Sequence, residues 1–170
     1  MSFDRVLNAV AIVKIAVRQH NIVARPFPEF FNLDEAIANG EQLPAEDFEV
    51  TEKLDGSLGI LYWLDGEPRL ATRGSFTSNQ ALVGTKIFQE RYGSAYFYPD
   101  FTYLFEIIYL ANRIVVDYKG MEDIILLAII ETKTGREYSY NDVQKLVGSA
   151  FSIVRLYDGI TDVHKLKELQ

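Results

Sequence analysis

The chain has 170 residues, with 24 acidic and 17 basic side chains, a net charge of −7, two histidines and no cysteine. Without cysteine, thiolate nucleophiles, disulfides and zinc–thiolate centres are excluded, and two histidines are too few for a histidine-rich metal site. The longest apolar run, Ile124–Ile130, is far below the roughly 20 residues of a membrane span and no signal segment opens the chain, so we expect one soluble, cytoplasmic domain over residues 1–170.

The acidic excess is concentrated in one segment. Residues 26–52 contain eight acidic residues and no basic ones, whereas residues 53–170 contain 15 acidic and 13 basic residues. A solvated acidic face that aids solubility is the simplest interpretation of this segment. The net charge also argues against a protein that coats nucleic acid without specificity, because such proteins carry a basic patch.

Short runs rich in aromatic and β-branched residues predict strands, in chain order, at residues 13–17, 21–25, 48–53, 58–64, 68–72, 103–109, 114–118 and 124–131. Asp55-Gly56 and Asp65-Gly66 predict tight hairpin turns between such runs, because both residue types tolerate positive φ.

Helices are predicted in three places. One begins after Ser78 and closes at Gly93, a second follows Ser139 with Asp142 three residues on, and a third begins at Thr161. Together with the strands, these elements predict an α+β domain whose sheet is mostly antiparallel.

Lys53 is the first candidate for chemistry. It lies in Thr51-Glu-Lys-Leu-Asp-Gly-Ser57, where a lysine beside a tight turn can project its amine into a pocket, and a neutral amine is a strong nucleophile. The alternative is a plain hairpin turn, because Trp63-Leu-Asp-Gly66 repeats the Leu-Asp-Gly pattern with tryptophan in place of the lysine.

Arg73 and Glu106 are the next candidates. Arg73, in Thr72-Arg-Gly-Ser-Phe76, suits a ribose or phosphate because its planar guanidinium donates two hydrogen bonds at once; the alternative is an exposed arginine at a strand end. Glu106 lies in a very apolar run, where a buried carboxylate is costly unless paired. Its partner would be a ligand hydroxyl, a metal-bound water or a cation such as Arg113, and a structural ion pair is the alternative.

Taken in order, these segments resemble the covalent nucleotidyltransferases, and among them the ATP-dependent RNA ligases of the bacteriophage tRNA-repair type. Residues 53–57 are similar to the family's nucleophile motif, residues 72–76 to its next motif and Phe105-Glu106 to its third. Further segments match its following strands (residues 112–118, 124–128 and 131–135) and its Arg-Pro-Phe-Pro-Lys-Phe-Phe-Asn signature (residues 25–32). The resemblance implies a nucleotidyltransferase core, an ATP-grasp-like ligase fold.

The resemblance also implies a mechanism. Lys53 would attack the α-phosphate of ATP, with Mg²⁺ as cofactor and no assigned metal ligands, and the lysyl-AMP would activate an RNA 5′-phosphate for joining to a 3′-hydroxyl in RNA repair, tRNA being a candidate substrate. Phe76, Tyr103 or Phe105 would stack on adenine. The residues it implies for nucleotide binding are Thr51, Glu52, Asp55, Gly56, Arg73 and Glu106, and those for RNA or phosphate contact are Ser57, Arg25 and Arg113.

The match has gaps. Glu29 stands where the family signature has a lysine, and the run at residues 13–17 lacks the family's Arg-Gly pair. No Glu-Gly pair occurs in the chain, and Lys165-Leu-Lys167 lies in a helical pattern rather than in a strand. Three hypotheses remain. The first is an incomplete RNA-ligase-type adenylyltransferase core, for which a second chain is one candidate source of the missing motifs. The second is a shortened ligase-like module that binds nucleotide, RNA or a partner without sealing RNA, and the third is an unrelated α+β domain with coincidental motifs.

Overall fold

The computed structural model describes residues 17–18, 21–27, 35, 38–40, 48–112 and 116–157. The chain divides into two compact units. One comprises Met1–Val13, Phe27–Glu52 and Leu156–Gln170, and the other comprises Lys14–Pro26 and Lys53–Arg155. In the first unit, the described residues include an antiparallel bridge between Thr51 and Leu156.

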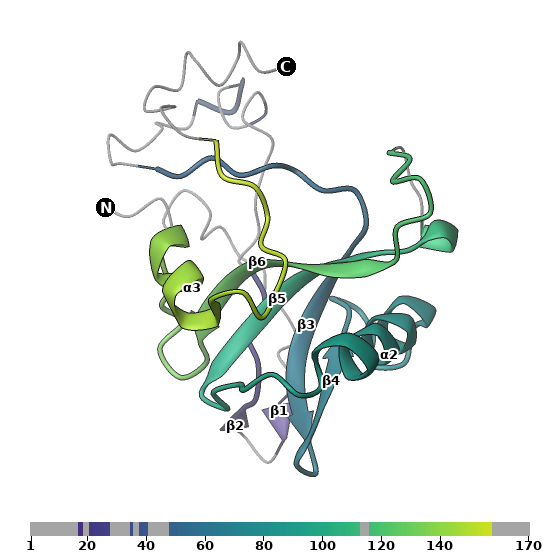
Figure 1. Ribbon diagram of the computed structural model, residues 1–170. Helices are drawn as coiled ribbons and strands as arrows, with labels where there is room; N and C mark the ends of the chain where they lie inside the picture. The colour runs from purple at the N-terminus through teal and green to yellow at the C-terminus, as the bar shows by residue number, and fades with distance from the viewer. Residues whose placement is uncertain are drawn as a thin grey trace. The chain divides into compact units, whose positions relative to one another are not determined.

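The second unit is built on a four-stranded antiparallel sheet in the order β4-β3-β5-β6 (Figure 1). Its strands are β3 (Ser57–Leu64), β4 (Glu67–Ala71), β5 (Phe101–Ile108) and β6 (Asp123–Glu131). All four were predicted from the sequence, with ends that differ by two residues or fewer. A short pair, β1 (Val17–Arg18) and β2 (Asn21–Ile22), forms a separate antiparallel sheet.

The turn between β3 and β4 confirms the prediction for Asp65-Gly66. Asp65 has φ 53° and Gly66 has φ 85°, so both residues adopt the left-handed conformation that a two-residue hairpin turn requires. Together, the strands and helices confirm the α+β class and the antiparallel sheet.

Helix α2 (Asn79–Tyr92) covers one face of this sheet and begins where the sequence predicts (Figure 1). The Ser78 side chain accepts a hydrogen bond from the N–H of Ala81 at 3.2 Å, which caps the helix. The contact with the sheet is close: a Cβ atom added at Gly84 would lie 2.7 Å from Cδ1 of Ile107. A glycine at this position therefore sets how near the helix can approach the sheet.

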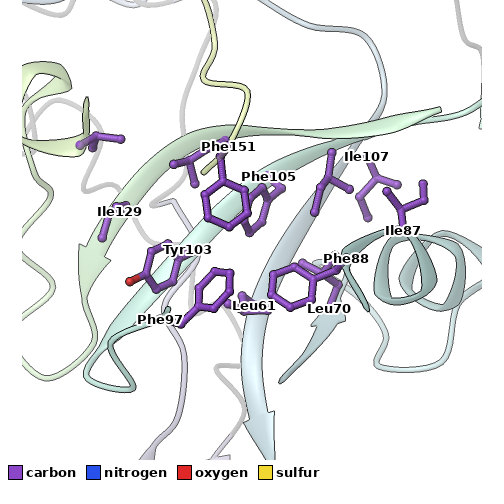
Figure 2. Close-up of a cluster of buried hydrophobic side chains, with 13 residues drawn as sticks. Leu61, Leu70, Ile87, Phe88, Phe97, Tyr103, Phe105, Ile107, Ile129 and Phe151 are labelled. Carbon is purple, nitrogen blue, oxygen red and sulfur yellow. The ribbon is translucent and has the colours of Figure 1, made fainter. Parts of the chain in front are cut away.

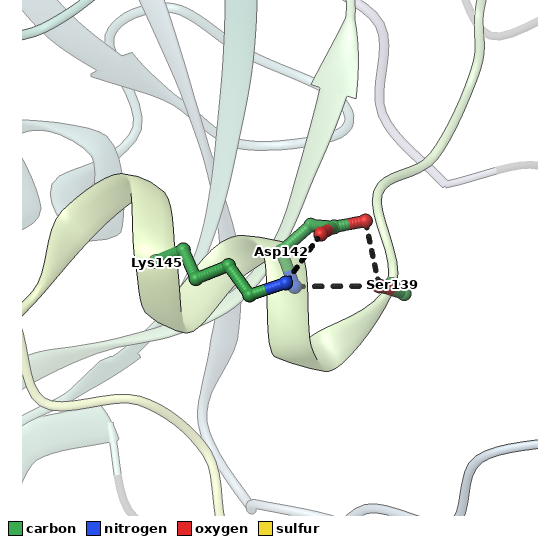
Figure 3. A network of polar contacts seen from close by, with 3 residues as sticks. All are labelled: Ser139, Asp142 and Lys145. Carbon is green, nitrogen blue, oxygen red and sulfur yellow. Dashed lines mark hydrogen bonds and ion pairs between the residues drawn. The ribbon is translucent and has the colours of Figure 1, made fainter.

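Helix α3 (Tyr140–Val147) is also capped as predicted (Figure 3). The Ser139 hydroxyl accepts a hydrogen bond from the N–H of Asp142 at 3.3 Å and donates one to the Asp142 carboxylate at 2.9 Å. Lys145, one turn later, lies 3.4 Å from the same carboxylate. These contacts lower the pKa of Asp142, first through the Ser139 hydrogen bond and then through Lys145.

Side chains alternate between the two faces of the sheet. On the face toward α2, a cluster of buried apolar residues forms the core, with Phe105 and Ile107 from β5 packed near Phe88 of α2 (Figure 2). Glu106 lies between Phe105 and Ile107 in the strand, so its side chain lies on the opposite face of the sheet. The cross-strand neighbours of Glu106 on that face are Leu58 and Ile125.

Two predictions for the segment before β3 were wrong. Residues 48–53 do not form a strand, and neither Asp55 nor Gly56 has positive φ. Contacts with distant residues set the path of this segment instead: the N–H of Asp55 donates to the Tyr118 hydroxyl, and the Asp55 carboxylate accepts from the N–H of Val116. A third prediction was also wrong: residues 116–118, the described part of the strand predicted at residues 114–118, are not a strand. The helix predicted from Thr161, and residues 13–16 of the first predicted strand, lie outside the described residues.

Candidate functional site

The predicted chemistry converges on one edge of the sheet. Because neighbouring strands are antiparallel, β3 and β6 begin at the same edge where β4 and β5 end. We call this end of the sheet, where two strands begin and the other two end, the site edge. It carries Lys53–Ser57 ahead of β3, the turn Thr72–Ser75 after β4, Glu106 near the end of β5, and Asn112 just beyond it.

Glu106 is half-buried at the site edge. Burial raises the pKa of its carboxyl group to about 7, although a hydrogen bond from the Gly56 N–H and the charge of Lys53 act in the opposite direction, and the charge of Asp55 adds to the rise. These influences place the lysine, the glycine amide and the glutamate in one electrostatic neighbourhood. A carboxylate in this setting gains from further hydrogen-bond donors.

Gly56 is required for this arrangement. A Cβ atom at this position would lie 2.5 Å from the carbonyl oxygen of Ile107 and 3.2 Å from Cγ of Glu106. Backbone cannot yield to such a contact as a flexible side chain can, so only glycine allows the segment to pass this close to β5 and to donate its N–H to Glu106.

We call residues 53–57, which match the family's nucleophile motif, the nucleophile loop; Asn112, Val116 and Tyr118 hold it. The N–H of Asp55 donates to the Tyr118 hydroxyl at 2.7 Å, and the Asp55 carboxylate accepts from the N–H of Val116 at 2.8 Å. The Ser57 hydroxyl and the Asn112 side-chain amide are hydrogen-bonded at 3.0 Å. Lys53 itself is exposed. Sequence reasoning missed Tyr118 and Asn112 as site residues, although both lie in the segment that it matched to the family.

Arg73 lies at the tip of a tight turn at the site edge. Thr72 and Ser75 exchange backbone hydrogen bonds of 2.8 and 3.3 Å, which leaves Arg73 and Gly74 exposed between them. Within the described residues, the Arg73 guanidinium has no hydrogen-bond or ion-pair partner. The structure thus places Arg73 at the same edge as Glu106, without a direct contact between them.

Arg25 lies at the end of the sheet opposite the site edge. Its Nε donates to the carbonyl of Thr132 at 2.6 Å and its Nη2 to that of Lys133 at 3.3 Å, while its N–H donates to the Thr102 hydroxyl at 3.0 Å. Thr102 is near the start of β5 and Thr132 follows β6, so the structure does not bring Arg25 to Lys53. Arg113, Glu29, Lys165 and Lys167 lie outside the described residues, and Thr51 and Glu52 are exposed members of the other compact unit.

Two of the three aromatic residues predicted to stack on adenine cannot do so. Tyr103 is 2% exposed and Phe105 is 0% exposed, and both belong to the buried cluster on the face of the sheet toward α2 (Figure 2). Phe76 remains available, because it is 47% exposed and its ring contacts Tyr62 edge-to-face at 5.0 Å between centroids. Strict alternation along β5 separates Phe105 from the Glu106 face.

No protein-only metal cage is present among the described residues, where no three His, Asp or Glu side chains gather. At the site edge, Asp55 already accepts from Val116 and Glu106 is half-buried. The described donors at the site edge therefore form no protein-only cage for Mg²⁺. In the part of the chain that the structure describes, no helix is long and apolar enough to cross a membrane.

Similarity to known proteins identifies the family of this chain. A sequence model of the RNA ligase family matches residues 11–170. The chain belongs to the RNA ligase family. This confirms the resemblance that the motifs indicate.

The individual relatives of this RNA ligase chain are distant in sequence, at 27% identity each. It is 27% identical over 180 residues to a provisionally named bifunctional polynucleotide kinase/RNA ligase of Autographa californica nuclear polyhedrosis virus, covering 84% of this chain and 26% of the relative. It is 27% identical over 140 residues to a provisionally named RNA ligase of Thermovibrio ammonificans, covering 79% and 37%. The chain thus spans well under half the length of these relatives.

The fold is shared with a solved RNA ligase. A mutant of Naegleria gruberi RNA ligase, solved with ATP and Mn, has a TM-score of 0.50 and 21% identity, over 81% of this chain and 44% of that one. At this identity the likeness shows the fold, and it confirms the predicted nucleotidyltransferase core.

Proposed function

We propose that the chain forms the nucleotide-transferring part of an RNA ligase, with Lys53 as the nucleophile. The Lys53 amine attacks the α-phosphorus of ATP, the N–P bond forms, and the bond from that phosphorus to the bridging oxygen breaks. Pyrophosphate leaves with the electron pair, and the amine loses its proton to solvent. The AMP then passes to an RNA 5′-phosphate, and a 3′-hydroxyl displaces it to join the strands, as RNA repair (of tRNA, for example) requires.

The observation that carries this proposal is the neighbourhood of Lys53, the Gly56 amide and Glu106. The Glu106 carboxylate is desolvated and lies on the face of the sheet opposite α2, so ribose hydroxyls that donate to it would replace the solvation that it has lost. In addition, the exposed Arg73 guanidinium, which has no partner in the described part of the chain, suits a phosphate or an RNA end. Phe76 offers an exposed ring for a base.

ATP would enter with a divalent cation on its phosphates. Such a cation neutralises the triphosphate charge and eases the departure of pyrophosphate. The residues of the chain bind and orient the nucleotide. Glu106 accepts hydrogen bonds from the ribose hydroxyls, Gly56 allows the loop to pass close to β5, and Lys53 supplies the nucleophilic amine.

A shortened binding module is the second candidate. It is favoured by Glu29 in place of the family lysine and by the lack of a Glu-Gly pair within these 170 residues. In that case a second chain that carries the missing motifs would be the partner needed for sealing, and this chain alone would bind nucleotide, RNA or that partner.

The intact mass of the protein after incubation with ATP and Mg²⁺ or Mn²⁺ distinguishes the two. Gain of one AMP by the unmodified chain and its loss in Lys53→Ala support the first proposal. Lys86→Ala removes an exposed lysine of α2 and is expected to keep the adduct. ATP binding in a calorimeter without any adduct, across metals and pH, would favour the binding module, and neither adduct nor binding would contradict both.

A further inference from the structure

We propose that Tyr118 and Asn112 are positioning residues for nucleotide transfer, which hold the nucleophile loop in register with Glu106. This inference rests on the proposed function of Lys53. Neither residue is placed to react, because each contacts the loop after Lys53 rather than Lys53 itself.

The loop depends on contacts from outside because it lacks regular structure of its own. Residues 53–56 are neither strand nor tight turn, so their main-chain groups must find partners elsewhere. The Asp55 N–H finds one in the Tyr118 hydroxyl, at 2.7 Å and 63 residues along the chain. The Asp55 carboxylate is held in turn by the N–H of Val116 at 2.8 Å.

Asn112 holds the other end of the loop. Its Nδ2 donates to the Ser57 hydroxyl and to the carbonyl of Ile107, both at 3.0 Å. Ser57 is the first residue of β3 and Ile107 is its cross-strand partner in β5. The Asn112 amide therefore joins the two strands at the point where the loop ends and the sheet begins.

Packing fixes where the Tyr118 hydroxyl lies. The ring packs against the buried cluster of Ile108, Ile125 and Val154, and Leu54 of the loop packs against the same cluster. Ring and loop thus share one apolar support. With Tyr118 and Asn112 holding Asp55 and Ser57, and Gly56 donating to Glu106, little freedom remains for the backbone that carries Lys53.

Such restraint affects chemistry more than stability. An attacking atom must lie about 3–3.5 Å from the phosphorus, and a displacement of about 1 Å can cost roughly 100-fold in rate. Loss of one neutral, partly buried hydrogen bond has only a small effect on folding by comparison. A residue that only packs would show the reverse: stability and rate would change together.

The chain offers a matched control in Tyr140. Its ring packs against the same cluster, and its hydroxyl donates to the carbonyl of Val154 at 2.9 Å, away from the loop. Tyr118→Phe and Tyr140→Phe each remove one hydroxyl from this cluster. We expect similar decreases in melting temperature, but a decrease of about tenfold in the rate of lysyl-AMP formation at saturating ATP only for Tyr118→Phe.

The effect of Tyr118→Phe should appear in kcat, with KM for ATP changed less than twofold, because the hydroxyl contacts the loop and not the nucleotide. Asn112→Ala should show the same split. Equal loss of rate in Tyr118→Phe and Tyr140→Phe would refute the positioning role.

Hydrogen–deuterium exchange of the Asp55 amide, measured without ATP, separates this inference from the proposed function. We expect exchange at least tenfold faster in Tyr118→Phe than in Tyr140→Phe. If that difference is found but the unmodified protein forms no lysyl-AMP, the restraint of the loop by Tyr118 is supported and the proposal that Lys53 is the nucleophile is refuted. If the amide exchanges equally fast in both variants, the inference about Tyr118 is wrong whatever the activity.

Discussion

At the scale of single residues, Gly56 permits the closest backbone approach at the site edge. In Gly56→Ala, the new methyl group would lie 2.5 Å from the Ile107 carbonyl oxygen, so the loop must move away from β5. We expect a loss of about 1–3 kcal/mol in the free energy of unfolding and loss of lysyl-AMP formation. Urea unfolding measures the first effect and intact mass the second.

Gly74 provides the stability control for this substitution. A Cβ atom there would meet nothing within 4 Å, and its φ is not positive, so Gly74→Ala should change the unfolding free energy by less than about 0.5 kcal/mol. Equal stability of the two variants would show that the contact at Gly56 is relieved without cost.

Glu106 makes the stability of the fold depend on pH. Burial raises the pKa of its carboxyl group from 4.5 to about 7, so the folded protein favours the protonated form. The stability that this provides is fully present below pH 4.5 and is lost as the pH rises through 7. Glu106→Gln removes the ionisation, and at pH 8 it should exceed the parent protein in unfolding free energy by about 1–2 kcal/mol, after allowance for the exposed part of the side chain.

Urea unfolding at pH 5 and pH 8 measures this effect. Between these values, the difference between Glu106→Gln and the parent should shift in favour of the variant. Glu90→Gln, on the exposed face of α2, serves as the control and should show no such shift. A difference that is the same at both pH values would mean that burial does not control the ionisation of Glu106.

At the scale of elements, the two capped helices differ in what their caps support. Among the described residues, the Ser139 side chain hydrogen-bonds only to the exposed Asp142 of its own helix, whereas Ser78 caps α2 and also lies 3.0 Å from the Thr72 hydroxyl in the Arg73 turn. Ser139→Ala should cost about 1 kcal/mol and Ser78→Ala about 2 kcal/mol.

Chemical denaturation of the two serine variants tests the difference. It also tests whether the Arg73 turn is coupled to α2, because Thr72→Val should remove most of the extra cost of Ser78→Ala. Equal costs for the two serine variants would contradict that coupling.

Elements with a local signal were predictable from the sequence, and the contacts that build the site were not. Strand periodicity and serine caps located β3 to β6, α2 and α3 within a few residues. The Asp55-Gly56 prediction failed because the path of this segment depends on contacts with Val116 and Tyr118, which no local pattern contains. Tyr118 was missed for a similar reason, since its hydroxyl meets a main-chain N–H 63 residues away. The face of Phe105, by contrast, could have been predicted from its alternation with Glu106.

At the scale of the whole molecule, net charge and local charge make different predictions for ATP binding. The protein carries −7, and the excess lies in residues 26–52, where Glu29 replaces a lysine of the family signature. If a cation at position 29 contributes to ATP binding, Glu29→Lys should tighten ATP binding about tenfold, equivalent to about 1.4 kcal/mol.

Glu35→Lys is the control: it changes the net charge equally, from −7 to −5, and Glu35 is exposed. Through the overall field alone it should improve binding less than twofold at 0.15 M salt, where charges about 8 Å apart are already screened. Calorimetric titration with ATP and Mg²⁺ compares the two variants, and equal improvement in both would assign the effect to the charge of the whole molecule and not to position 29.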